Sequence, residues 1–139
     1  MSKQRTLCII KPDAVEKRKA GAIIQRLLDE GFDILGLRQT LLSRHQAEGF
    51  YAIHRERPFF GELVQFMTRS PVVLIALERD DAVQHLRNVI GATDPAKAAE
   101  NTVRKLFGAN IGENAVHGSD SVDNGRIECS YYFPGVDLI

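Results

Sequence analysis

The segment at residues 71–78, PVVLIALE, constrains the fold more than any other part of the sequence. Six consecutive apolar residues follow its proline, whereas a strand with one face in water alternates apolar and polar residues. Because successive side chains of a strand point to opposite faces, this run predicts a central strand that is covered on both sides. The rest of the chain must supply that cover.

Three other segments are typical of strands. Residues 5–11, RTLCIIK, are apolar and favourable for β-structure, and Pro12 ends them. Residues 32–42 follow a break at Gly31, and residues 115–117 form a short apolar run. Together with the segment at 71–78, they predict a sheet of four strands.

Helical patterns separate these strands. One apolar face recurs at the spacing of a helix before Gly31, which is placed to end it, and consists of Ile23, Ile24, Leu27 and Leu28. Ser43 is suited to cap a second segment, in which Ala47, Phe50 and His54 share a face.

Two further helices are expected in the middle of the chain. Residues 61–67 form a short one, and Asp80 and Asp81 open another whose apolar residues at 82–90 turn inward. The resulting order, β-α-β-(αα)-β-α-β, predicts an α+β fold, a ferredoxin-like βαββαβ sandwich. We expect a four-stranded antiparallel sheet with helices on its surface, in a single domain over residues 1–139.

Composition and charge narrow the functional classes. The 18 basic and 18 acidic residues cancel, whereas general nucleic-acid binding needs a basic excess, so no specific nucleic-acid partner is expected. The longest apolar run, at 72–77, is too short to span a bilayer, and no secretory signal follows the N-terminal charges. Cys8 and Cys129 are far apart and favour free thiols in a reducing compartment, so we expect a cytoplasmic protein.

The most informative local segment is NAVHGSDS at residues 114–121. His117 ends an apolar run and precedes a glycine and residues suited to a turn and a helix N-cap. The pattern predicts an imidazole at a strand-to-helix junction, where backbone N–H groups favour an anion. A neutral ring nitrogen is then available as a nucleophile. Either Glu128 or Asp120 could accept a hydrogen bond from the other nitrogen and fix the tautomer.

Four residues are candidates for phosphate binding. Lys11 ends the first predicted strand, Arg87 lies on the predicted helix at 80–90, and Thr93 and Arg104 lie in the loop that follows. Phosphoryl transfer depends on positioning and charge neutralisation by several cations, and the arginine fork suits phosphate. The sequence contains neither a GxxxxGK[ST] nor a GxGxxG loop, so any phosphate must be bound by side chains.

The sequence RPFF at residues 57–60 places two aromatic residues in a turn. A ring that points outward could stack on a nucleotide base. Both rings could instead lie in the core, and we expect this of Phe60. Phe59 is a candidate for stacking only if it is exposed beside a phosphate site.

Taken together, these segments resemble the nucleoside diphosphate kinase family. NAVHGSD at 114–120 is similar to the family signature N-x-x-H-G-S-D, and TLCIIKPDA at 6–14 is similar to its opening strand and K-P-D motif. Four more segments occur in the family's order and at its spacing: RPFF at 57–60, PVV at 71–73, GATDP at 91–95 and TVR at 102–104. The resemblance extends from Arg5 to about Phe133.

The resemblance implies an enzyme that passes the γ-phosphate of a nucleoside triphosphate to a nucleoside diphosphate. It implies a ping-pong reaction through a phosphohistidine on His117, with broad base specificity. In this family pattern Glu128 orients the imidazole and Ser119 binds Glu128, while Lys11 and Tyr51 lie near the transferred phosphate.

The resemblance also implies how the rest of the nucleotide is held. Arg87, Thr93 and Arg104 would bind the other phosphates, Lys11 and Asn114 the sugar hydroxyls, and Phe59 and Ile111 the two faces of the base. Mg²⁺ would arrive on the nucleotide phosphates, so no protein metal ligand is expected. The partners are nucleoside di- and triphosphates and further copies of the chain, in a dimer-based tetramer or hexamer.

The alternative is a catalytically silent nucleotide-binding scaffold of the same fold. Loss of His117, Lys11 or either arginine would favour it, but all are present. The departures from the family pattern lie elsewhere: Arg69-Ser70 for the usual Ser-Gly, Glu100-Asn101 for Pro-Gly and Lys105-Leu106 for Gly-Asp. These changes bear on loop stability and subunit contacts, and Asn101 suits the left-handed geometry that the glycine would take.

Overall fold

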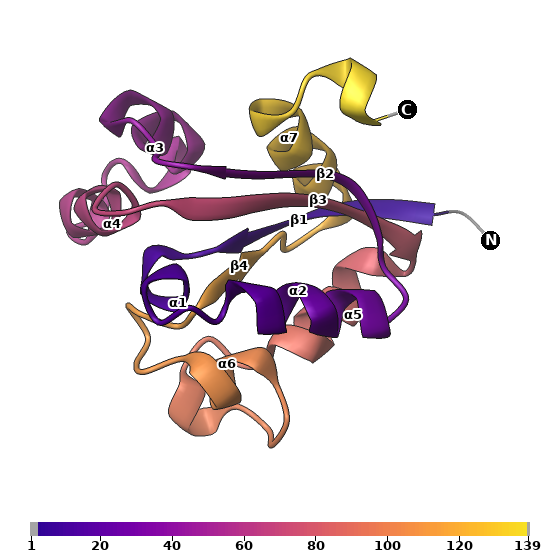
Figure 1. Ribbon diagram of the computed structural model, residues 1–139. Coiled ribbons are helices and arrows are strands. Elements are labelled where there is room, and N and C mark those ends of the chain that lie inside the picture. Colours follow the sequence, from indigo (N-terminus) through magenta and orange to yellow (C-terminus); the bar gives the residue numbers. More distant parts are fainter. Residues whose placement is uncertain (1–2, 139) are drawn as a thin grey trace.

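The computed structural model describes residues 3–138, which form one sheet of four strands with helices on both faces (Figure 1). The strands are β1 (Lys3–Ile10), β2 (Asp33–Thr40), β3 (Val72–Asp80) and β4 (Val116–Gly118). The helices are α1 (Pro12–Glu16), α2 (Ala20–Asp29), α3 (Arg44–Phe50), α4 (Phe60–Met67), α5 (Ala82–Ile90), α6 (Val103–Phe107) and α7 (Val122–Tyr132). Three short 3₁₀ turns complete them, at Ala52–His54, Pro95–Lys97 and Gly135–Leu138.

The sheet confirms the predicted ferredoxin-like plan. Its strand order is β2-β3-β1-β4, and each neighbouring pair is antiparallel. The first and third strands of the sequence therefore lie in the centre, and β2 and β4 form the edges. This is the order of a split βαβ unit, in which helices connect β1 to β2 and β3 lies between these two strands.

The alternation of side chains along β3 divides the interior into two cores, one on each side of the sheet. Val73, Ile75 and Leu77 pack with α2 and α5, whereas Val72, Leu74 and Ala76 pack with α4 and α7. Figure 1 shows α2, α5 and α6 on one side of the sheet and α3 and α7 on the other. The apolar run at 72–77 is thus buried on both faces, as expected.

Helix α7 lies unusually close to β1, and Gly125 permits this approach. A Cβ atom at residue 125 would lie 2.2 Å from the carbonyl oxygen of Arg5. Ser121 caps the helix by accepting a hydrogen bond from the backbone N–H of Asn124 at 3.1 Å. The close contact and the cap together fix the position from which α7 carries Glu128 toward β4.

Two helices occupy segments in which none was predicted. Pro12 ends β1, as expected, but it also takes the first position of α1, where its fixed φ favours a helix. Residues 103–107 form α6, which Thr102 caps, so the prediction that Arg104 lies in a loop is wrong. Both helices have five residues, too few for an apolar periodicity to be visible in the sequence.

Three local predictions also need correction. Helix α3 ends at Phe50, so His54 lies in the following 3₁₀ turn and not on the α3 face. Leu28 is 47% exposed and does not contribute to the buried face of α2. Asp80 belongs to β3, and α5 begins after Asp81, because the register with β1 extends the strand to its end.

Two other local predictions, the cap at Ser43 and the backbone geometry of Asn101, are confirmed. Ser43 caps α3 with a reciprocal capping box, since its hydroxyl accepts from Gln46 N at 3.0 Å and Gln46 Oε1 accepts from Ser43 N at 2.9 Å. Asn101 takes a φ of 66°, the left-handed geometry expected of it. Within residues 3–138, no helix combines the length and the apolar character that crossing a bilayer requires.

Candidate active site

His117 lies on β4, the short edge strand, and faces the α7 side of the sheet. Its register partner on β1 is Ile9, which packs in the core beneath α4 and α7. Directly paired residues of antiparallel strands point to the same face. The imidazole is therefore presented to α7, with its side chain 20% exposed.

The structure places Glu128 of α7, and not Asp120, beside this imidazole. Nε2 of His117 lies 2.8 Å from Glu128 Oε1, whereas Asp120 accepts from Asn124 Nδ2 at 2.6 Å. The hydroxyl of Ser119 donates to the same Glu128 oxygen at 2.6 Å and accepts from the backbone N–H of Leu7 at 3.0 Å. In the tautomer that donates from Nε2 to this carboxylate, Nδ1 is the unprotonated nitrogen.

Aromatic residues of α3 and its C-terminus enclose the imidazole. The ring of Phe50 meets it nearly edge-on, with centroids 5.4 Å apart and planes at 75°. Tyr51 lies beside Phe50, and its buried hydroxyl has no hydrogen-bond partner among residues 3–138. Burial, reinforced by the charge of Glu128, raises the pKa of Tyr51 well above its ordinary value. The phenol is therefore a neutral donor in search of an acceptor.

Lys11 follows β1 directly and reaches the same cleft. Its Nζ donates to Asn114 Oδ1 at 2.8 Å, and Asn114 Nδ2 donates to the carbonyl oxygen of Thr93 at 3.0 Å. Burial and the nearby Arg104 cation lower the pKa of Lys11 to about 8, although the carboxylate of Asp13 acts in the opposite direction. This ammonium is consequently a cation whose charge is sensitive to its surroundings near neutral pH.

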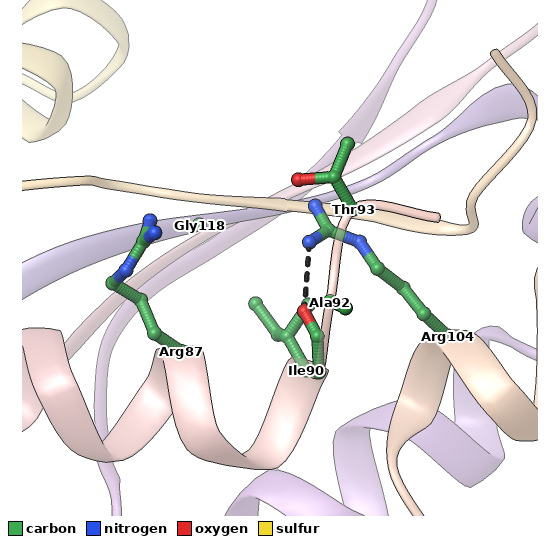
Figure 2. Close-up of a pocket in the computed structure, with 7 residues that line it drawn as sticks. Arg87, Ile90, Ala92, Thr93, Arg104 and Gly118 are labelled. Carbon is green, nitrogen blue, oxygen red and sulfur yellow. Dashed lines mark hydrogen bonds between the residues drawn. The ribbon is translucent and has the colours of Figure 1, made fainter. Parts of the chain in front are cut away.

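Arg104 of α6 is held rigidly between two segments. Its guanidinium donates to the carbonyl oxygens of Gly91 at 3.0 Å and Val116 at 2.9 Å. Figure 2 shows the first of these bonds, with Arg104 extending from α6 toward the C-terminus of α5. Burial, followed by the influence of Arg87, lowers the pKa of Arg104 to about 10. The guanidinium is still charged at neutral pH and is preorganised for an anion.

A small pocket of about 160 Å³ lies between α5 and α6 and contains Arg87, Thr93 and Arg104. Gly118 forms part of its wall, and a Cβ there would lie 2.7 Å from Ile90 Cδ1. Figure 2 shows the side chains of Arg87 and Arg104 rising from separate helices toward this region. Two cations and a hydroxyl thus converge where a phosphate group would fit.

A larger cleft of about 920 Å³ adjoins the small pocket and shares Thr93 and Arg104 with it. It also contains the other predicted contact residues, namely Lys11, Tyr51, Phe59, Ile111, Asn114 and His117. Phe59 and Ile111 are 46% and 60% exposed, and Phe60 packs partly buried against the core. The structure therefore gathers the predicted site residues around this cleft and the adjoining small pocket, which contains Arg87, with Glu128 and Ser119 behind the imidazole.

Four features of the site were not found from the sequence. The sequence pattern assigns Phe50 only to a core face, and it places Gly118 and Asp13 in family motifs without giving either residue a role. The fourth is an ionic cluster around Arg69, which binds Glu16 at 2.7 Å and Glu113 at 3.4 Å, while Ser70 also binds Glu16. The Arg69-Ser70 departure thus links α1 to the loop that carries Ile111. In the sequence, only the departure of Arg69-Ser70 from the family pattern marks this ionic cluster.

The cations of the site suit phosphate. Within residues 3–138, no three histidine, cysteine, aspartate or glutamate side chains cluster as metal ligands. The small pocket and the inner part of the site instead present Lys11, Arg87 and Arg104, whereas Glu62 and Glu113 also line the larger cleft. Such a donor set would repel a free cation and would accept one that is already bound to a nucleotide's phosphates.

Comparison with protein families gives a match over nearly the whole chain. The family model described as nucleoside diphosphate kinase matches residues 4–138. A nucleoside diphosphate kinase of Sorangium cellulosum is 59% identical over 138 residues, which cover 99% of this chain and 96% of that protein. A nucleoside diphosphate kinase of Geobacter sulfurreducens is 50% identical and covers 98% of this chain and 99% of its own.

Solved structures agree with the sequence comparison. The nucleoside diphosphate kinase of Aquifex aeolicus superimposes with a TM-score of 0.96 at 43% identity, over 99% of this chain and all of its own. A halophilic nucleoside diphosphate kinase from Halobacterium salinarum, solved in complex with CDP, gives a TM-score of 0.91 at 35% identity and covers 96% and 89% of the two chains.

Proposed function

Because the chain belongs to the nucleoside diphosphate kinase family, we propose that it transfers phosphate between nucleotides through a phosphohistidine at Nδ1 of His117. The chain is a nucleoside diphosphate kinase, a transferase that moves the terminal phosphate of a nucleoside triphosphate to a nucleoside diphosphate. The observation that carries the proposal is the 2.8 Å contact of Nε2 with Glu128. This contact leaves Nδ1 as the unprotonated nitrogen.

The transfer takes two steps: the phosphate first moves to His117 and then moves from His117 to the acceptor. In the first, the lone pair of Nδ1 forms a bond to the γ-phosphorus as the bond to the bridging oxygen breaks, and the diphosphate leaves with that electron pair. The imidazole becomes positively charged, and Glu128 stabilises it through Nε2–H, while Ser119 holds Glu128 in place. In the second, the terminal oxygen of an acceptor diphosphate attacks the phosphohistidine and restores the free ring.

The cations neutralise the phosphates during both steps. Arg104 and Arg87, with the hydroxyl of Thr93, would hold the phosphates that are not transferred. Lys11 and the unpartnered hydroxyl of Tyr51 would contact the moving phosphoryl group. Fixed donors of this kind are effective because they need not reorganise as negative charge redistributes in the transition state.

The exposed ends of the cleft suit a nucleoside. Phe59 and Ile111 would enclose the base, and Lys11 and Asn114 would bind the sugar hydroxyls. Stacking uses the π-face that every base offers, so broad base specificity is expected. ATP and other nucleoside triphosphates would serve as donors, carrying Mg²⁺ on their phosphates, where it would neutralise charge.

Labelling of the protein tests this proposal directly. Incubation with γ-labelled ATP and Mg²⁺ should leave about one acid-labile, alkali-stable label per chain, because a phosphoramidate bond has that stability pattern. Addition of an unlabelled nucleoside diphosphate should remove the label and produce labelled triphosphate. A wild-type protein that transfers phosphate without ever becoming labelled would contradict the phosphohistidine and favour direct transfer, and one that binds nucleotide without transfer would favour a silent scaffold.

The activity should also decline as the pH rises above about 8, the value to which the pKa of Lys11 is lowered. Below this pH the ammonium is charged and attracts phosphate, and above it the amine is neutral. The pH profile of kcat/KM reports groups of the free enzyme. Lys11→Arg should reduce the overall rate but move this decline to higher pH, because a guanidinium stays charged. An unchanged decline in that variant would assign it to another group.

We further propose that the protein is a dimer-based homo-oligomer, a tetramer or hexamer. The support is the edge strand β2, which pairs on only one side among residues 3–138 and whose Leu37 is 45% exposed, with Leu41 beyond it at 58%. Exposed apolar edge strands favour pairing with another chain. Size-exclusion chromatography with light scattering would show a single-chain mass if this is wrong.

We also propose that the protein is a single domain and that it is cytoplasmic. The chain is proposed to be one domain, because a single sheet supports both helical layers. A cytoplasmic location is proposed because Cys8 and Cys129 are both free and buried, as expected of thiols in a reducing compartment. Fractionation of the source cells would test the location.

A further inference from the structure

The turn that precedes β4 has a strained backbone. Ala115 is completely buried and has a φ of 73°, a value that non-glycine residues rarely adopt. The N–H of Val116 donates to the carbonyl oxygen of Asn114 at 2.9 Å. A hydrogen bond that spans two residues around a positive central φ defines the rare and strained form of the γ-turn. Such a turn persists only when its surroundings hold it.

Two groups at the junction of β1 and α1 hold this turn. The backbone N–H of Lys11 donates to the carbonyl oxygen of Ala115 at 2.8 Å. The N–H of Ala115 donates to Asp13 Oδ2 at 3.1 Å, in a buried contact between residues 102 positions apart. The first bond needs only backbone atoms, whereas the second depends on the side chain of Asp13.

The position of Asp13 is unusual for a carboxylate. The residue is 1% exposed, and its second oxygen, Oδ1, has no hydrogen-bond partner among residues 3–138. Burying a charged group is costly unless it is paired. The helix that contains Asp13 is only five residues long and gains no side-chain cap from it, so capping does not explain the charge.

The turn is continuous with the reacting groups. Asn114, which binds Lys11 and Thr93, precedes Ala115, and His117 follows two residues later on β4. A rotation of the backbone at Ala115 would therefore move the Asn114 amide and the imidazole relative to one another. Displacements of about 1 Å can cost roughly 10²-fold in rate.

We propose that Asp13 is a positioning residue of this enzyme, which holds the strained turn at Ala115 and thereby aligns His117 and Asn114 with the bound nucleotide. The role rests on the proposed nucleophilic function of His117. Asp13 does not line the cleft and acts through the backbone and not through the substrate.

The charge of Asp13 has a second effect on the same site. Three groups face the Lys11 ammonium: Asp13 from α1, Arg104 from α6, and the uncharged Asn114 amide. Arg104 lowers the pKa of Lys11 and Asp13 raises it. Removing the carboxylate should therefore leave Lys11 neutral at a lower pH.

Two variants separate the hydrogen bond from the charge. Asp13→Ala removes both and should lower kcat about 10²-fold. Asp13→Asn keeps an oxygen that can accept from Ala115 and should retain most of kcat well below pH 8, where Lys11 is charged, while the decline of kcat/KM begins at a lower pH than in the wild type. Asp29→Asn, at an exposed aspartate of α2, is the matched control and should leave both unchanged.

A second background distinguishes positioning from simple loss of stability. Glycine adopts a positive φ without strain, so Ala115→Gly no longer needs Asp13 to hold the turn. We expect Asp13→Ala to cost about tenfold less in kcat in the Ala115→Gly background than alone. All rates are expressed per chain that accepts label from γ-labelled ATP. The folded fraction of each variant is determined from its urea unfolding curve.

The outcomes are distinguishable. If wild type is labelled and Asp13→Ala has wild-type kcat per labelled chain, or if its cost is the same with Ala115→Gly, the positioning role is wrong and the phosphohistidine stands. If wild type is not labelled, the proposed function itself fails. If Asp13→Ala does not fold, Asp13→Asn provides the test. A decline of kcat/KM at the same pH as in the wild type would contradict the action of this carboxylate on the site.

Discussion

Replacing His117 with alanine should abolish labelling by γ-labelled ATP and lower nucleoside diphosphate kinase activity by about 10⁴-fold or more, since the covalent intermediate can no longer form. The loss should lie in kcat. The variant should still bind nucleotide, because the cations, Phe59 and Ile111 are unchanged. Filter assays of label and steady-state kinetics, with nucleotide binding measured by calorimetry, check the three parts separately.

His45→Ala provides the matched control for this experiment. His45 lies on α3, is exposed, and does not line the cleft. Both label and rate should match the wild type. If His117→Ala were still labelled, or if His45→Ala lost its label, the nucleophile would have been assigned to the wrong residue.

The second large effect is expected at Arg104. Arg104→Ala should lower kcat/KM by about 10³-fold, because this guanidinium positions and neutralises the phosphates that are not transferred, and the loss of one preorganised donor to a phosphate chain contributes on this scale. It should also lower the free energy of unfolding by about 1–3 kcal/mol, since the carbonyls of Gly91 and Val116 lose their donor. Steady-state kinetics and urea unfolding measure the two losses independently.

Arg104→Lys refines this prediction. Lysine keeps the positive charge but has no planar fork with which to bridge the two carbonyls and a phosphate at once. It should therefore recover only part of the rate. The neighbouring Lys105→Ala removes an exposed cation from the same helix and should change neither quantity. Equal losses at residues 104 and 105 would indicate a general electrostatic effect and contradict a specific phosphate contact.

The fold was predictable where local and long-range requirements agree. The run at 72–77 is apolar on both faces of a strand, and β3 is indeed buried by helices on both sides. By contrast, α1 and α6 were missed, because five residues give no measurable periodicity. Pro12 both ends the strand β1 and occupies the first position of α1, and only the end of the strand is predicted from the sequence.

The site shows a similar division. The sequence offered two partners for His117, and the position of α7 relative to β4 selects Glu128 over Asp120. That position depends on the close approach at Gly125. Phe50, whose ring meets the imidazole edge-on, was visible only as an apolar residue. Neither contact can be derived from spacing, because each joins elements that are far apart along the chain.

The sequence by itself determined the strand order along the chain, the two-sided core and the residue types that carry phosphate chemistry, because periodicity and motif spacing are local properties. Only the tertiary structure decided which ring nitrogen of His117 is free, and which carboxylate holds it. It also revealed that the N–H of Ala115 depends on Asp13, 102 residues away. The physical reason is that a buried polar group must find its partner wherever the chain brings one, and sequence distance does not limit that choice.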